Sequence, residues 1–193
     1  MKTICIYCAS SSQINPVYFE TTARLGKILA EAGLSVVFGG GSNGLMGHLA
    51  DTILDSNGKI TGVIPKFMCD ENWQHEKLSE LIVVESMHKR KALMAEMADA
   101  IIALPGGCGT MEELLEAITW KQLGIISVPI VILNINGYFN PMIEMLHRAV
   151  EEKFMREVHK NMWIVVDSPE EVLNAIELSR DNWDVNARKF AAI

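Results

Sequence analysis

The residues best suited to chemistry are glutamates that follow a glycine-rich turn. Residues 104–113 read LPGGCGTMEE, and Glu116 lies three positions beyond Glu113. Because residues three apart meet on one helix face, Glu113 and Glu116 are predicted to share a face, with Glu112 pointing away. Two carboxylates on one face need a cation or a substrate to balance their charge. Such a pair suits cleavage of a glycosidic bond to ribose, in which a carboxylate stabilises positive charge at the sugar carbon or activates water.

The same turn has the features of an anion site. The apolar run at 100–104 suits a buried strand, and the residues after the turn suit a helix. Backbone N–H groups and the positive end of the helix dipole converge at such a junction, and glycines let the backbone approach a ligand closely. The residues predicted to hold a phosphate through their N–H groups are Gly106, Gly107, Gly109 and Thr110.

A second glycine-rich turn at residues 39–44 also follows a strand-like run and precedes a helix-like one. In open α/β sheets such turns line the crevice at the carboxyl ends of the strands, so Gly40 and Gly41 are predicted to help bind the ligand. Neither turn carries a G-x-G-x-x-G or a P-loop motif. Two alternatives stay open: both turns are merely tight turns, and Glu113 merely closes a capping box with Thr110.

Residues 87–91, MHKRK, supply cations near a predicted helix start. Arg90 and Lys91 are predicted to reach the crevice and offset the carboxylates, whereas Lys89 is expected on the solvated surface. His88 is either a proton carrier or a partly buried polar residue. Ser10 and Ser12 follow the first predicted strand, where a hydroxyl can contact phosphate, but no G-x-S-x-G motif accompanies them.

The elements that position these residues alternate between strand-like and helix-like runs. Strands are predicted at residues 3–8, 34–38, 59–64, 81–84, 100–104, 128–133 and 163–166. This alternation predicts an α/β fold: a doubly wound, mostly parallel, Rossmann-like sheet with helices on both faces, in a single domain over residues 1–193. Gly33 is predicted to end the first helix, and Ser168 to open the last. Residues 66–79 have no clear period and are predicted to form a loop or flap over a site.

Composition narrows the class of protein. The chain has 193 residues, of which 49% are hydrophobic and 21% charged, and its net charge of −7 argues against nucleic acid or an anionic membrane as a partner. No apolar run reaches the roughly 18 residues of a membrane span, and the first residues read as a strand, so a cytoplasmic protein is expected. Cys5 and Cys8 would point to opposite faces of a strand, so they are expected to be core residues. We expect neither a metal nor a cofactor.

At these motifs the sequence resembles the LOG family, the cytokinin riboside 5′-monophosphate phosphoribohydrolases. PGGCGTMEE at 105–113 matches the family's P-G-G-x-G-T-x-x-E signature, and MHKRK resembles its M-H-x-R-K element. The runs at 8–12, 39–47 and 119–124 are also similar to family motifs. The likeness covers nearly the whole chain and keeps the order of every motif.

The resemblance implies a homodimer that hydrolyses the N-glycosidic bond of a nucleoside 5′-monophosphate. The products would be ribose 5-phosphate and a free base, ideally an N6-modified adenine. Arg90 and Glu113 would be the catalytic pair. Lys91, Glu116 and Thr119 are predicted to bind the substrate, with Glu116 orienting the ribose hydroxyls.

Related sequences often carry a lysine decarboxylase label, but no residue pattern here marks a pyridoxal-phosphate lysine. Two alternatives remain open. One is a nucleotide carrier or sensor that holds its ligand without cleaving it. The other is a general AMP nucleosidase, because the sequence does not reveal the base preference.

Overall fold

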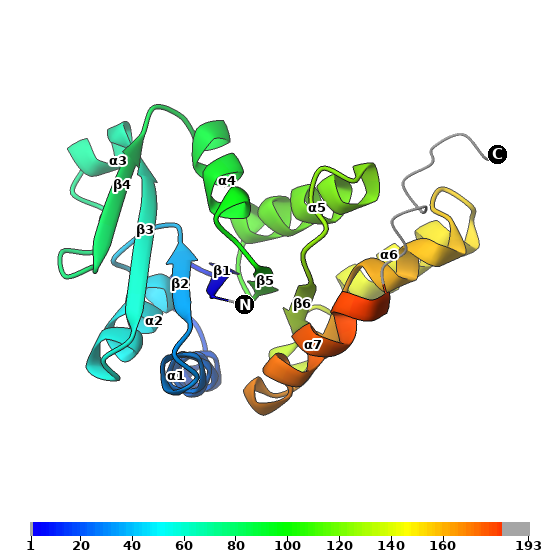
Figure 1. Cartoon of the computed structure of the whole chain (residues 1–193), viewed down its shortest axis with the longest axis horizontal. Coiled ribbons are helices and arrows are strands. Elements are labelled where there is room, and N and C mark those ends of the chain that lie inside the picture. The colour runs from blue at the N-terminus through cyan, green and yellow to red at the C-terminus, as the bar shows by residue number, and fades with distance from the viewer. Residues whose placement is uncertain (1, 183–193) are drawn as a thin grey trace.

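The computed structural model describes residues 2–182, which are arranged around one seven-stranded parallel sheet (Figure 1). The strand order is β4-β3-β2-β1-β5-β6-β7. The strands are β1 (Thr3–Tyr7), β2 (Ser35–Phe38), β3 (Lys59–Pro65), β4 (Glu80–Val84), β5 (Ala100–Ala103), β6 (Ile130–Leu133) and β7 (Ile164–Val166). The predicted doubly wound α/β fold is confirmed. The predicted domain extends to residue 193, and residues 183–193 lie outside the described part.

Helices connect successive strands, as parallel pairing requires. The α-helices are α1 (Pro16–Glu31), α2 (Gly44–Asp55), α3 (Lys66–Asp70), α4 (Met87–Glu96), α5 (Cys108–Leu123), α6 (Asn140–Glu151) and α7 (Val172–Asn182). Short 3₁₀ turns are η1 (Ile135–Gly137), η2 (Glu157–Met162) and η3 (Pro169–Glu171). Figure 1 shows α4 and α5 on one side of the sheet and α1 on the other.

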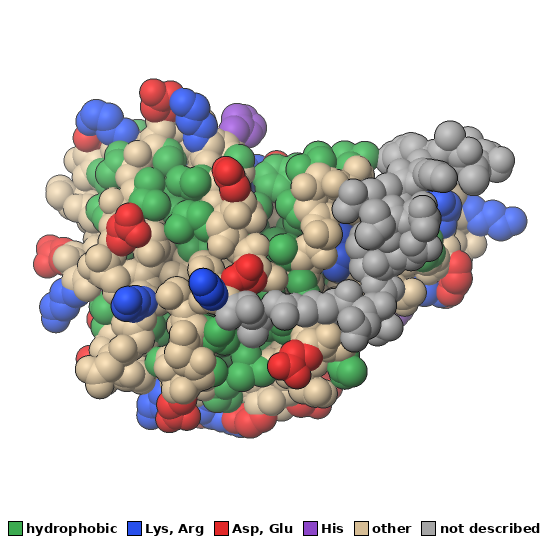
Figure 2. Space-filling model, viewed as in Figure 1, with side chains coloured by type: hydrophobic (Ala, Val, Ile, Leu, Met, Phe, Trp, Pro, Cys, Tyr) green, Lys and Arg blue, Asp and Glu red, His purple; other side chains and the backbone are tan. Residues whose placement is uncertain are grey.

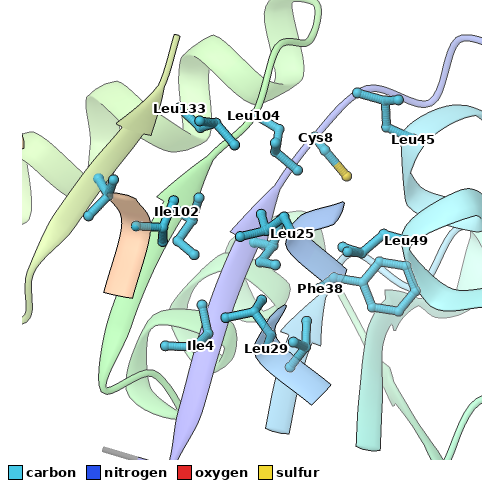
Figure 3. Packing of buried hydrophobic residues seen from close by; sticks show 14 of the residues in the cluster. Ile4, Cys8, Leu25, Leu29, Phe38, Leu45, Leu49, Ile102, Leu104 and Leu133 are labelled. Carbon is cyan, nitrogen blue, oxygen red and sulfur yellow. The ribbon is translucent and has the colours of Figure 1, made fainter. Parts of the chain in front are cut away.

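Each face of the sheet packs against its own hydrophobic core. On one face, side chains of α1, α2 and α7 meet alternate residues of the strands, as Figure 3 shows for Leu25, Leu49 and Phe38. On the other face α4, α5 and α6 do the same. Alternation along β1 sends Ile4 to the first core and Cys5 to the second. Because both faces are covered, the strands read as continuous apolar runs.

The order of the strands creates one topological switch point. From β1 the chain runs outward through β2, β3 and β4, and it then returns to place β5 on the other side of β1. The connections that leave β1 and β5 therefore diverge, and they open a crevice at the carboxyl edge of the sheet. The glycine-rich turn after β5 lies at this edge.

Local signals explain most element boundaries. Asn15 caps α1 by accepting a hydrogen bond from the N–H of Val17, and Gly33 follows the helix with φ of +68°. Ser168 and Glu171 form a capping box at η3, which leads into α7. Within the segment predicted to be irregular, residues 66–70 form the short helix α3. A helix of five residues is too short to be predicted from hydrophobic periodicity.

The outer surface bears charges of both signs. Figure 2 shows acidic and basic side chains interspersed over the visible face, with no large cluster of either sign. Between residues 2 and 182, none of the helices has the length and apolar character that crossing a membrane demands.

Candidate active site

A cavity of about 560 Å³ opens at the switch point. It is lined by the residues that follow β1 and β2, by the start of α5, by α4 and by the segment that follows β3. Its size falls within the range of about 300–1,000 Å³ that is typical of small-molecule sites. Of the predicted site residues, those that line it are Gly41, Arg90, Gly107, Gly109, Thr110 and Glu113.

Arg90 and Glu113 face each other inside this cavity. Nη2 of Arg90 lies 3.6 Å from Oε1 of Glu113, and each side chain is only 9% exposed. Helix α4 delivers the arginine and α5 delivers the glutamate, so the pair joins two helices on the same face of the sheet. At 3.6 Å the two groups attract each other without forming a tight bidentate pair.

The guanidinium of Arg90 also keeps unused donor capacity. Its Nε is buried and finds no hydrogen-bond partner among residues 2–182, and its Nη1 contacts only the weak acceptor Sδ of Met87, at 3.6 Å. A buried donor without a partner costs free energy, so this Nε is available to a ligand or a water molecule that accepts from it.

Glu113 is electrostatically unusual. Burial raises the pKa of this carboxyl above its ordinary value of 4.5, and the nearby Arg90 opposes the rise. Glu112 and Glu116 raise the pKa of Glu113 further through their negative charge. A carboxyl whose pKa is raised by burial beside a cation is typical of residues that exchange protons or stabilise charge.

The turn after β5 presents the start of α5 to the cavity. Helix α5 begins at Cys108, and the N-cap residue Gly107 makes no side-chain cap, so the first N–H groups of the helix remain for a ligand. Thr110 is buried within the helix, 4% exposed, and does not cap it. The alternative that Glu113 merely closes a capping box with Thr110 is therefore wrong.

The carboxylates of Glu112, Glu113 and Glu116 form ion pairs that differ from the predicted pattern. Lys91, only 7% exposed, forms ion pairs with both Glu112 and Glu116, the latter at 3.0 Å, whereas Glu113 turns to Arg90. The prediction that Glu112 points away from its neighbours is wrong. Residues four apart are also helix neighbours, and the cation on α4 decides which pair is used.

Several predicted binding residues lie outside the cavity. Gly40 and Gly106 are buried and do not line it, and the buried side chain of Lys91 pairs with carboxylates of α5. Glu116 and Thr119 belong to a shallow neighbouring hollow on α5, whose lining includes Met111 and Leu115. The two hollows share Cys108 and Glu112, so they are contiguous at the start of the helix.

The sequence predicted only the flap at residues 66–79 over the site, whereas the structure gives the cavity a larger apolar wall. It consists of Ile64, Met46, Met68, Trp73 and Met87. The segment after α3 is fastened over the first glycine turn, since the N–H of Ser42 donates to the carbonyl of Trp73 at 2.9 Å and Gly41 pairs with Gln74 in an antiparallel bridge. The expected flap over a site therefore exists. Methionines that line a cavity cannot be distinguished by sequence from methionines in the core, so only the fold shows which ones line it.

The remaining candidates are placed as follows. Cys5 and Cys8 lie in the opposite cores, and burial raises the pKa of both thiols far above the ordinary range. Ser10 lines the cavity, and His88 is exposed on α4. Lys89 is exposed and paired with Glu85, as expected of a surface residue. Within the described part of the chain, no cluster of side chains is suited to a metal ion.

The fold and the cavity define a doubly wound α/β protein with an uncapped helix start and a buried arginine–glutamate pair at its switch point. The family described as "Possible lysine decarboxylase" matches residues 46–176. A protein of Oryza sativa subsp. japonica called "Probable cytokinin riboside 5'-monophosphate phosphoribohydrolase LOG4" is 43% identical over 91% of this chain and 76% of its own. The Arabidopsis thaliana protein "Cytokinin riboside 5'-monophosphate phosphoribohydrolase LOG7" is 40% identical over 95% and 84%.

The chain therefore belongs to the LOG family, the proteins that the broader family description calls possible lysine decarboxylases. The molybdenum cofactor carrier protein of Chlamydomonas reinhardtii shares the fold, with a TM-score of 0.71 over 92% of this chain and 97% of that one. At 17% identity this likeness concerns the fold alone.

Proposed function

We infer that this protein hydrolyses the N-glycosidic bond of a nucleoside 5′-monophosphate and releases a free base and ribose 5-phosphate. The observation that carries this inference is the buried Arg90–Glu113 pair, which lies in one cavity with the uncapped start of α5. The activity is the one for which the relatives at 40–43% identity are named.

The 5′-phosphate binds at the start of α5. The N–H groups of Gly107, Gly109 and Thr110 are at the positive end of a 16-residue helix, where a phosphate is favoured. Gly106 supports this turn from behind, and Gly41 lines the opposite side of the cavity. The overall charge of the protein is negative, so these local donors have to provide the attraction.

Glu113 and Arg90 act on the ribose. As the bond between the base and C1′ breaks, positive charge develops on the sugar, and the carboxylate of Glu113 stabilises it or directs the attacking water. The water supplies oxygen to C1′, and its proton ends on the departing base. Arg90 orients the ribosyl phosphate through its unpaired donors and offsets the charge of Glu113.

The base lies against the apolar wall. Met46, Met68 and Trp73 offer an uncharged face for a planar ring and room for an apolar substituent. An N6-modified adenine is therefore the favoured base, since its alkyl group would bury apolar surface here.

The protein acts as a cytoplasmic homodimer of single-domain subunits in this proposal. Leu115 and Ile125 are 43% and 65% exposed on and just after α5, and Figure 2 shows hydrophobic side chains along the edge where this helix lies. A second copy that packs there would cover them. Glu116 and Thr119 face the same surface, so their predicted contacts with substrate depend on that second copy. The cytoplasm would keep the exposed thiol of Cys108 reduced.

The experiment is a chromatographic assay of the purified protein with AMP and N6-isopentenyl-AMP in parallel. Preferential release of isopentenyladenine is the expected result. Faster cleavage of AMP would keep the reaction and assign the enzyme to general nucleotide breakdown. Release of no base from either substrate, with nucleotide binding intact, would refute hydrolysis in favour of a carrier or sensor.

A further inference from the structure

Tyr138, which lies outside the cavity, directly contacts the glycine-rich turn between β5 and α5. It follows η1 in the connection after β6, and its hydroxyl donates a hydrogen bond of 2.6 Å to the backbone carbonyl of Gly106. This bond links two segments 32 residues apart in sequence. The proposed roles of the helix start and of the arginine–glutamate pair do not involve this hydrogen bond.

The peptide unit between Gly106 and Gly107 needs such a restraint. Glycines on both sides tolerate either sign of φ, so this unit can rotate at low steric cost. In a trans peptide the carbonyl and the following N–H point in opposite directions. Rotation would therefore replace the N–H of Gly107, a cavity-lining residue, with the carbonyl of Gly106, which repels an anion.

The turn is held from two sides. A Cβ at Gly106 would overlap the side chain of Thr110, so that buried threonine packs directly against the turn. Tyr138 holds the carbonyl on the other side. With its carbonyl fixed on Tyr138, the peptide unit directs the N–H of Gly107 away from that ring.

Hydrogen bonds and ring packing in the surrounding turn hold Tyr138 in position. Asn134 is buried, its Oδ1 accepts from the N–H of Phe139 at 2.8 Å, and its Nδ2 donates to Oδ1 of Asn140 at 2.8 Å. Gly137 has φ of +69°, which favours glycine at this turn. The ring of Tyr138 packs edge-on against Phe139 and against Tyr18 of α1, with centroid separations of 5.2 and 6.2 Å.

We propose that Tyr138 is a positioning residue for phosphate recognition: its hydroxyl fixes the Gly106–Gly107 peptide so that the N–H of Gly107 serves the 5′-phosphate of the substrate. This inference rests on the proposed function only for the identity of the phosphate ester. It predicts that removal of the Tyr138 hydroxyl lowers the affinity for phosphorylated ligands selectively, because Tyr138 does not line the cavity where sugar and base would lie.

The test is Tyr138→Phe, with Tyr18→Phe as the matched control. The control removes a hydroxyl from the neighbouring ring and leaves the bond to Gly106 in place. Calorimetry with ribose 5-phosphate and with adenosine measures the two parts of the site separately, and it needs no turnover. A protein that binds ribose 5-phosphate but releases no base would therefore refute hydrolysis without affecting this test.

In Tyr138→Phe we expect the Kd for ribose 5-phosphate to rise about fivefold, the change that loss of one hydrogen bond produces. The Kd for adenosine should stay within about twofold, and the control should match the wild type in both. With the full substrate, KM should rise while kcat changes little. An unchanged Kd for ribose 5-phosphate would refute the proposal, and so would an equal weakening of both ligands.

Discussion

Replacement of Gly39 by alanine is expected to disable the site mainly by displacing Arg90. Gly39 follows β2 directly and lines the cavity, and its backbone conformation suits alanine. A Cβ there would overlap Nη2 of Arg90 and come within 3.0 Å of Cζ. The guanidinium would have to retreat by more than about 1 Å to restore ordinary contact. It would then lose its position beside Glu113, from which 3.6 Å now separates it.

A displacement of this size costs about a hundredfold in kcat/KM when it moves a group that orients the substrate. Stability should change by less than about 1 kcal/mol, because the atoms that give way are the end of a flexible side chain. Steady-state kinetics of base release and thermal melts of the same preparations measure both quantities.

A double-mutant cycle with Arg90→Gln supplies the decisive comparison. If Gly39→Ala acts through the arginine, it should add nothing to the loss that Arg90→Gln already causes. Losses that multiply in the double variant would refute the reasoning. Full activity in Gly39→Ala alone would show that the observed position of Arg90 is not the one used in catalysis.

Four further results are expected. Glu113→Gln should lower kcat by about 10²–10⁴-fold with ribose 5-phosphate binding retained, and normal turnover would remove its assigned role. Because burial raises the pKa of Glu113, its ionised form costs free energy in the folded state, so melts at pH 7 should show Glu113→Gln stabilised, and this gain should vanish below the ordinary carboxyl pKa of 4.5. Burial lowers the pKa of Lys121 from 10.5 to about 8, so the unfolded chain binds the extra proton between these values. The free energy of unfolding in urea should therefore increase as pH rises through this range, and Lys121→Met should flatten that increase; an unaltered slope would contradict it. Leu115→Asp should halve the mass measured by sedimentation if α5 forms the dimer interface, and an unchanged mass would place that interface elsewhere.

Much of the site follows from local sequence. The turn at 104–113 had to follow a buried strand and begin a helix, because its apolar run is short and its glycines precede helix-forming residues. Arg90 and Glu113 belonged to motifs whose residue types suit an anion and a developing cation. The structure places both in one cavity, where their catalytic role remains a prediction.

Other assignments failed because they depend on neighbours distant in sequence. Helix periodicity alone made Glu113 and Glu116 partners, but Lys91 on α4 gathers Glu112 and Glu116 instead. Apart from the predicted flap that carries Met68 and Trp73, the apolar wall was not identifiable from sequence, because apolar side chains look alike whether they fill a core or line a cavity.

The sequence by itself determined the alternation of strands and helices, the two glycine-rich turns and the residue types that act there, because these depend on periodicity and backbone freedom within a few residues. Only the tertiary structure decided that β5 lies beside β1, and hence that the turn after β5 opens into the switch-point crevice. It also decided that Tyr138 holds the carbonyl of Gly106. Strand order and such distant contacts result from the packing of both cores at once, which no local pattern records.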